Sequence, residues 1–201
     1  GVTSYDFITG GTGSGSVNNK HTVSLLEGLN NAGFKIDQEL ANLYVPFAEK
    51  EALAEKERRK SQGILALPQR LPEMEMTEDF INKQAENSAI AFLTLGRNSG
   101  EGGDRVVDND FNLGKDEIDL IDKVSKAFHE KGKKVVVILN IGGVIETASW
   151  KDKVDAILLA WQPGQEGGNS VADVLAGKVN PSGKLTMTFP MKYEETPSAK
   201  N

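Results

Sequence analysis

The residues best suited to chemistry lie in one glycine-rich stretch, Gly96–Arg105. It carries two carboxylates and two guanidinium groups, on Glu101, Asp104, Arg97 and Arg105. Glycines let the backbone bend and approach a ligand closely, and a charged loop that follows an apolar run, here residues 89–95, is typical of binding and catalytic loops. The same composition also fits a solvated surface loop whose charges pair with one another, because loop polarity alone is only a correlation. Both interpretations stay open at this point.

Other kinds of catalytic site have little support in the sequence. There is no cysteine, which excludes thiolate chemistry, and with only two histidines a His-rich metal site is implausible. The loop Gly10–Ser16 lacks the spacing of a dinucleotide fingerprint, and no G-x-x-x-x-G-K-[S/T] motif occurs. A serine triad lacks its G-x-S-x-G elbow. What remains is carboxylate chemistry centred on Glu101, with Glu166 and Asp104 as further candidates, and we predict no cofactor and no metal.

The composition limits the size and the partners of the protein. Its 201 residues suffice for one domain with a core. The net charge of −6 argues against nucleic acid or an anionic membrane as a main partner, since both call for basic patches. No apolar run approaches the length of a membrane span, and no secretory signal is present at Gly1. We therefore expect a cytoplasmic protein, but secretion stays open because the chain does not begin with Met and its true N-terminus is unseen.

Apolar runs alternate with amphipathic helices in the second half of the chain. We expect strands at 89–95, 135–139 and 156–161, and helices at 115–130, 144–150 and 169–176. The run 135–139 is apolar on both faces, which is typical of a central parallel strand. The pattern predicts an α/β fold, an open and mainly parallel sheet with helices on both faces, or α/β sandwich. Alternating apolar residues at 184–189 predict an additional edge strand, which could be antiparallel.

The first half of the chain is expected to be mainly helical. We predict a helix over residues 21–31, a second helix capped by Asp37 that kinks or breaks at Pro46, and a third capped by Thr77. Residues 2–8 are expected to be the end of a strand or an extended lead-in. We assign residues 1–190 to the domain and residues 191–201 to a tail or linker.

Four glycine-rich loops follow predicted strands or the lead-in, at residues 10–16, 96–105, 140–143 and 162–168. Because parallel strands all end at the same edge of a sheet, these loops should gather at the carboxyl edge. Ligands of open α/β sheets bind at that edge. We therefore predict a site there.

Five motifs, in the same order, resemble the second domain of family-3 glycoside hydrolases, in particular bacterial β-glucosidases. They are Gly10–Gly15, Arg97–Gly102, Val135–Gly142, Trp161–Gly168 and Asn180–Leu185. The resemblance runs from Val2 to about Pro190. It implies a retaining glycosidase whose nucleophilic aspartate lies on a separate (β/α) barrel, in a motif absent here. Family members have a complete strand just before the segment that matches residues 2–8, so the resemblance implies that this first strand is missing.

The resemblance also implies roles for single residues. Glu101 matches the general acid/base, Ser14 matches a position near the substrate pocket, and Glu166 matches a glutamate that we interpret as structural. We predict that Arg97, in the motif of Glu101, also binds the substrate, a β-glucoside or an oligosaccharide. The isolated chain should be inactive, because retaining hydrolysis needs both carboxylates. The alternative is a non-catalytic module that binds a sugar or a nucleotide in the same crevice.

Overall fold

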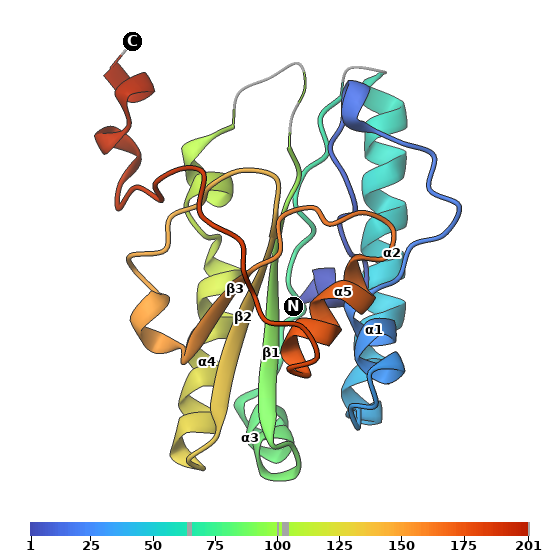
Figure 1. The fold of residues 1–201 in the computed structure, drawn as a ribbon, viewed down its shortest axis with the longest axis vertical. Coiled ribbons are helices and arrows are strands. Elements are labelled where there is room, and N and C mark those ends of the chain that lie inside the picture. Colours follow the sequence, from blue (N-terminus) through green and yellow to red (C-terminus); the bar gives the residue numbers. More distant parts are fainter. Residues whose placement is uncertain (64–65, 100, 102–104, 201) are drawn as a thin grey trace.

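A computed structural model describes residues 1–63, 66–99, 101 and 105–200 of the chain. Its centre is a parallel sheet of three strands in the order β1-β2-β3, made of Ile90–Arg97, Lys134–Ile141 and Ala156–Leu159 (Figure 1). Ile90 lies opposite Lys134, and Val136 lies opposite Ala156. The predicted parallel α/β sheet is confirmed, and its central strand is β2, as the apolar run 135–139 indicates.

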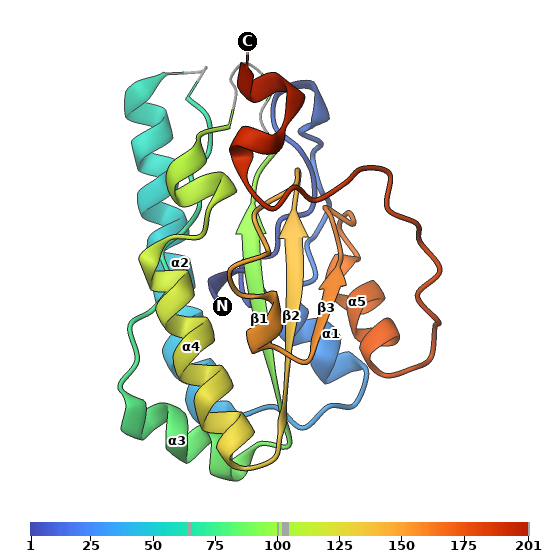
Figure 2. The ribbon, with the colours of Figure 1, turned by 90° about the vertical axis from the view of Figure 1, so that its left-hand side faces the viewer.

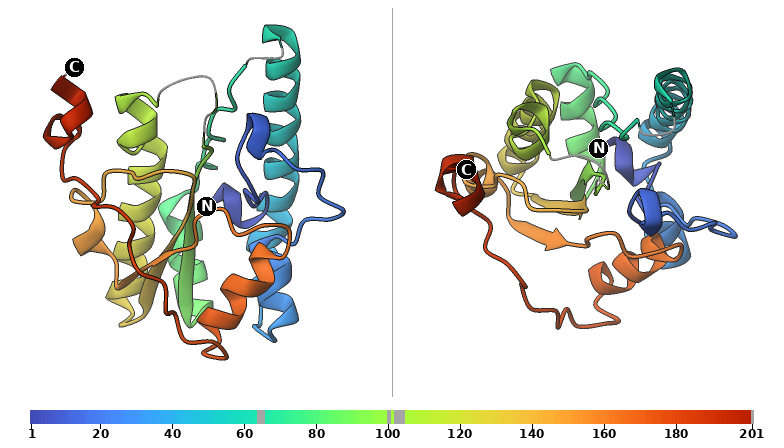
Figure 3. Two further views of the ribbon diagram at one scale, coloured as in Figure 1. Left: turned by 45° about the horizontal axis from the view of Figure 1, so that its top comes forward. Right: turned by 90° about the horizontal axis from the view of Figure 1, so that it is seen from above.

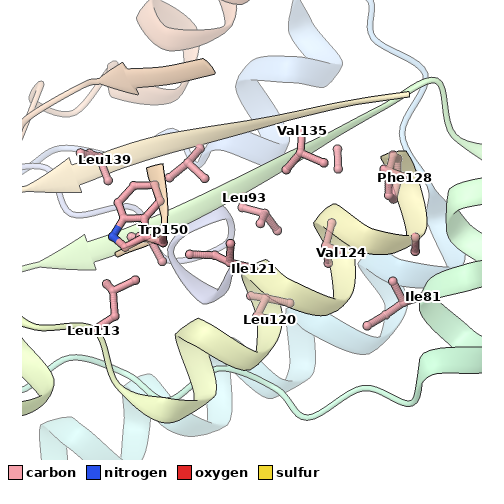
Figure 4. Packing of buried hydrophobic residues seen from close by; sticks show 14 of the residues in the cluster. Ile81, Leu93, Leu113, Leu120, Ile121, Val124, Phe128, Val135, Leu139 and Trp150 are labelled. Carbon is pink, nitrogen blue, oxygen red and sulfur yellow. The ribbon is translucent and has the colours of Figure 1, made fainter. Parts of the chain in front are cut away.

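Helices α3 (Glu78–Asn87) and α4 (Lys115–Glu130) cover one face of the sheet (Figure 2). The Oγ1 atom of Thr77 accepts a hydrogen bond from Phe80 N–H, so Thr77 caps α3 as predicted. The apolar stripe of α4 packs on the inward side chains of β1 and β2 and forms the largest core cluster, with Ile121, Val135 and Trp150 at most 1% exposed (Figure 4). Burial of this stripe fixes α4 on the sheet.

Helices α1 (Leu25–Asn31) and α5 (Gly167–Leu175) cover the other face (Figure 3). Their backbones touch at two glycines: a Cβ atom on Gly28 would lie 2.0 Å from the carbonyl oxygen of Gly168, and one on Gly168 would lie 1.9 Å from that of Ser24. Any side chain at either position would push the two helices apart. The contact holds the start of α5 and the loop before it against residues 23–28.

Helix α2 (Gln38–Gln62) is continuous through Pro46, so the predicted break is wrong. A single proline removes one backbone hydrogen bond, and here the helix is held by packing on both sides of it. Tyr44 stacks on Tyr5 with ring centroids 4.9 Å apart, and Tyr44 and Ala48 are both buried. Tertiary packing therefore outweighs the local effect of the proline.

Three short predictions near the N-terminus and after β2 differ from the structure. Residues 2–4 form a 3₁₀ turn rather than the end of a strand, and α1 begins at Leu25 because Ser24 and Glu27 form a capping box. Residues 144–150 contain turns instead of a helix, with a 3₁₀ turn following at Lys151–Lys153. In each case a hydrogen-bonding cap or turn decides the boundary, which apolar spacing alone does not reveal.

The segment 184–189 is not a strand, so the predicted edge strand is wrong. Leu185 and Met187 are 65% and 49% exposed, and Phe189 alone packs inward, 6.3 Å from the ring of Trp161. Alternation of apolar residues favours a strand only where one face of the segment is buried, and here two of the three apolar side chains lie exposed. Strand β3 is consequently an edge strand of the described sheet, and Ile157 is 39% exposed.

The residues assigned to the tail contain 3₁₀ turns at Tyr193–Glu195 and Pro197–Lys200. The ring of Tyr193 contacts that of Phe111 at 5.8 Å, so this segment touches the α/β body (Figure 2). Among the described residues, no helix is long and apolar enough to span a membrane.

Candidate functional site

The four glycine-rich loops meet around Ser99, just beyond the carboxyl end of β1. Thr12 Oγ1 donates a hydrogen bond to the carbonyl oxygen of Ser99 at 2.7 Å, and Ser99 Oγ donates to Gln162 Oε1 at 3.2 Å. A Cβ atom on Gly142 would lie 2.5 Å from the backbone nitrogen of Ser99, so the third loop passes directly against it. The predicted gathering of the loops at the carboxyl edge is confirmed for their described residues.

Asn140, near the end of β2, holds the residues that precede two of these loops, 10–16 and 162–168. Its side chain is fully buried, and its Oδ1 atom accepts Ile8 N–H at 2.7 Å. Its Nδ2 atom donates to the carbonyl oxygens of Ile8 and Trp161 at 2.9 and 2.8 Å. One amide thereby satisfies three backbone groups, which anchors the residues that lead into the first and the fourth loop.

Glu101 lies exposed above this frame and is bound by the first glycine loop. Its carboxylate accepts the backbone N–H of Ser14, and its own N–H donates to Thr12 Oγ1 at 3.1 Å. Gly13 has a φ of 62°, and a Cβ atom there would lie 2.1 Å from Glu101 Oε2, so both its conformation and its contact call for glycine. The structure thus brings the predicted pair Ser14 and Glu101 together.

The Ser14 contact also sets the protonation of Glu101. The Ser14 N–H, followed by the Ser14 side chain, holds the pKa of the Glu101 carboxyl below its usual range, because both hydrogen bonds favour the charged form. In the part of the chain that the structure describes, Glu101 makes no ion pair with a cation. The Glu101 carboxylate is therefore held in its charged form by Ser14, and Arg97 and Arg105 pair with other carboxylates.

Arg97 is not part of this cluster in the structure. Its side chain is buried, and its Nη1 and Nη2 atoms each donate to Glu117 at 2.7 Å. Arg105 pairs with Asp110. The two arginines are thus ion-paired with carboxylates outside the loop, so the interpretation in which the loop charges pair with one another is wrong for them. Substrate binding by Arg97 stays a prediction that no contact supports.

The other candidate carboxylates lie elsewhere or outside the described residues. Glu166, at the start of α5, accepts hydrogen bonds from His21 Nε2 and from Asn169 Nδ2, the latter at 2.7 Å. The His21 contact is the first cause that lowers the pKa of Glu166. These partners fit the structural role predicted for Glu166. Asp104 is outside the described residues.

Two cavities hollow the surface next to the loops that surround Glu101, although Glu101 itself lines neither of them. One, of about 440 Å³, is lined by Gly10–Gly13, Gly96 and Asn98, and the other, of about 650 Å³, by Asn98, Ser99 and Arg105 among others. Both volumes fall within the range of small-molecule sites, about 300–1,000 Å³. The described residues contain no group of three His, Asp or Glu side chains that could hold a metal ion.

Several residues that build the site were not singled out from the sequence. The sequence places Thr12 in a glycine loop and Asn140 in a turn, and it carries no signal that marks Asp110 or Glu117. A polar residue directly after an apolar strand, as Asn140 is, is the available signal. The partners of such a residue belong to distant segments, so their identity required the fold.

Comparison with known proteins identifies the relatives of this arrangement. The family model described as "Glycosyl hydrolase family 3 C-terminal domain" matches residues 4–201. The chain is 34% identical to β-glucosidase A of Butyrivibrio fibrisolvens and 31% identical to a β-glucosidase of Ruminococcus albus, over 96% and 98% of its length. It superposes on β-glucosidase 3B of Thermotoga neapolitana, solved in complex with glucose, with a TM-score of 0.89 and 45% identity over 100% of its length.

These relatives are much longer than the chain. The matches cover 25% and 20% of the two curated β-glucosidases and 28% of the Thermotoga neapolitana chain. The chain therefore corresponds to about a quarter of each relative.

Proposed function

Because the chain belongs to the glycosyl hydrolase family 3 C-terminal domain family, we propose that it contributes the general acid/base Glu101 to a retaining β-glucosidase. The substrate is a β-glucoside or an oligosaccharide, whose O-glycosidic bond is cleaved between two carboxyl groups. The nucleophilic aspartate belongs to a (β/α) barrel domain of the same enzyme. The position and surroundings of Glu101 carry this proposal.

Glu101 is suited to the role by its place and by its lack of a cation. It follows β1 at the carboxyl edge of the sheet, where open α/β folds bind ligands, and its contact residues Thr12 and Gly13 line a cavity of ligand size. An ion-paired carboxylate would be a poor proton donor, and the described residues place no cation on Glu101. Its hydrogen bond from Ser14 N–H joins it directly to the second predicted site residue, which is Ser14 itself.

The second carboxyl group has to come from another part of the enzyme. A retaining mechanism needs it about 5–5.5 Å from the acid/base. The described contacts of Glu101 are with Thr12, Gly13 and Ser14, none of which is a carboxylate. This supports a nucleophile supplied by a domain that packs against the carboxyl edge.

Catalysis also requires a change in the pKa of Glu101. A general acid must be protonated when the first step begins, whereas the Ser14 contact holds the pKa of Glu101 down. Burial against the barrel and the charge of its aspartate would both raise the pKa. We therefore expect the active protonation state to arise when the two domains meet and the Ser14 contact weakens.

The test is the Glu101→Ala variant of the enzyme that contains this domain. Glycosides with poor leaving groups should lose kcat/KM by about 10²-fold or more, because general acid catalysis contributes about that much. A dinitrophenyl glucoside needs little protonation, so it should still form the glycosyl-enzyme, which then accumulates. Azide needs no base, so it should restore turnover and give a glycosyl azide of retained configuration.

Glu166→Ala is the matched control, because Glu166, like Glu101, is an exposed carboxylate. It lies directly before α5. Its loss should act through stability, and azide should not help. Azide rescue of Glu166→Ala but not of Glu101→Ala would show that the wrong carboxylate is assigned. Unchanged hydrolysis in both variants would favour a non-catalytic binding module instead.

A further inference from the structure

Two arginines at the two ends of the Glu101 loop converge on one aspartate. Arg97 is the last residue of β1, Arg105 follows Glu101 by four positions, and Asp110 lies in the turn Val107–Phe111 that comes next. Asp110 contacts both guanidinium groups. We use the name Asp110 clamp for these three residues.

The contact between Asp110 and Arg105 is the stronger half of the clamp. Arg105 Nη2 donates to Asp110 Oδ1 at 2.6 Å, and Arg105 Nε lies 3.0 Å from Oδ2, so the pair is bidentate. Arg105 Nη1 also donates to the carbonyl oxygen of Val144 at 2.8 Å. Bidentate pairs restrict orientation as well as distance, so the residue that ends the loop is held in both.

The contact between Asp110 and Arg97 closes the other end. Arg97 Nε donates to the carbonyl oxygen of Asp110 at 2.7 Å and lies 3.6 Å from its carboxylate. Arg97 is itself held by Glu117 at the start of α4. The first end of the loop is thereby tied to the sheet, to α4 and to Asp110 at once.

Asp110 is itself fixed. The next residue, Phe111, is 5% exposed, and its carbonyl oxygen accepts Glu146 N–H at 2.8 Å. Asp110 Oδ2 also accepts Val106 N–H at 3.3 Å. The clamp is therefore attached to the core of the domain, so both ends of the loop have a fixed base.

We propose that Asp110 is a positioning residue for Glu101, which restrains the loop so that the carboxyl group meets the leaving-group oxygen. The inference rests on the proposed function. A catalytic group displaced by about 1 Å can lose about 10²-fold in rate, so a loop that carries one gains from fixed ends. Asp110 does not need to touch the substrate for this role. It acts through the two arginines.

The experiment compares Asp110→Asn with Asp155→Asn in the enzyme that contains this domain. The two carboxylates have similar side-chain exposure, 24% and 22%, and each pairs with a cation, but Asp155 precedes β3 at the opposite edge of the sheet. Asp110→Asn should lower kcat/KM at least about tenfold for glycosides with poor leaving groups and less than about threefold for a dinitrophenyl glucoside. Asp155→Asn should leave kcat/KM unchanged for both kinds of substrate.

A double variant identifies the path of the effect. Arg105→Gln should reproduce the leaving-group dependence. Adding Asp110→Asn to it should lower kcat/KM little further, because both changes break the same Arg105–Asp110 contact. Equal losses for all leaving groups, or no loss, would show that Asp110 supports only the fold. Full additivity of the two changes would also overturn the proposal.

Amide hydrogen exchange keeps the inference separate from the proposed function. Asp110→Asn should speed exchange of the peptide that spans residues 98–105 severalfold while leaving that of β2 unchanged. If Glu101→Ala has no leaving-group dependence, the proposed function fails, and the exchange result then shows whether Asp110 holds the loop. Unchanged exchange in that peptide would overturn the clamp itself.

Discussion

Arg97 and Glu117 form a buried, bidentate ion pair that joins the end of β1 to the first turn of α4. Both N···O distances are 2.7 Å, and the two side chains are 2% and 3% exposed. Glu117 Oε2 also accepts Gly114 N–H at 2.9 Å, so the carboxylate caps the helix while it binds the arginine. The pair connects the frame of the candidate site to the largest core cluster.

Removing one charge of this pair should destabilise the fold strongly. Glu117→Gln leaves the buried Arg97 guanidinium with only the more distant Asp110 carboxylate as a countercharge, which should cost about 3–5 kcal/mol of unfolding free energy in urea titrations. Asp119→Asn, which breaks an exposed pair with Lys115 on the same helix, should cost less than about 0.5 kcal/mol. Similar losses in both variants would mean that the buried pair contributes no more than a surface pair.

Position 140 should not tolerate even aspartate, which has nearly the same shape as asparagine. In Asn140→Asp, the two N–H donors to the carbonyl oxygens of Ile8 and Trp161 are lost and a carboxyl group is buried among acceptors. We expect a loss of about 2–5 kcal/mol in unfolding free energy, since buried groups are left unsatisfied. Asn87→Asp, at an exposed position at the end of α3, is the control and should change stability by less than about 1 kcal/mol. A neutral Asn140→Asp would show that the loops are held by other contacts.

Acid should remove a stabilising contribution of Asp155. Lys134, the Val135 N–H and His129 lower the pKa of the Asp155 carboxyl in the folded protein. A group with a lowered folded-state pKa stabilises above its unfolded pKa, about 3.9, and loses this contribution as the pH falls below that value. The urea midpoint should therefore drop between pH 5 and pH 2, and Asp155→Asn should flatten this drop. A variant with the same pH profile as the parent would contradict the assignment.

The protonation of Glu101 can be measured in the chain itself. A titration of its carboxyl carbon by NMR should give a pKa below the ordinary glutamate value, because Ser14 donates to the charged form. Ser14→Ala removes the side-chain contribution and keeps the N–H, so the pKa should rise only part of the way towards the ordinary value. An unperturbed pKa in the parent chain would show that the Ser14 contact does not persist in solution.

The elements that the sequence predicted well are those whose pattern repeats many times. Helix α4 runs over Lys115–Glu130 as expected, β1 begins one residue later and ends two residues later than predicted, and β2 contains the predicted run with one extra residue before it and two after it. Long apolar periods are decisive because each repeat must be buried on one face. The segment 184–189 shows the same alternation over only three apolar residues, and it forms no strand in the structure.

Within the candidate site, the sequence places Arg97 and Glu101 in one loop and predicts that both act on the substrate, Glu101 as the acid/base and Arg97 as a binding residue. The fold separates them: the Glu101 carboxylate lies exposed on the first glycine loop, whereas the Arg97 guanidinium turns inward to Glu117. Arg97 and Glu101 are four positions apart in the sequence, which allows their side chains to point in opposite directions. Which direction each side chain takes depends on the partner it meets.

The sequence by itself therefore determined the class of fold and the edge that gathers the glycine loops, and it singled out Glu101 as the carboxylate that we propose as the acid/base. These follow from local periodicity, from the geometry of parallel sheets and from the kinds of residue present, none of which needs a distant contact. The tertiary structure alone decided that Ser14 holds Glu101, that Asn140 joins the first and fourth loops, and that Asp110 binds both arginines. Most of these contacts join residues far apart in the chain, and their energies depend on burial and on hydrogen-bond geometry that only the folded chain creates.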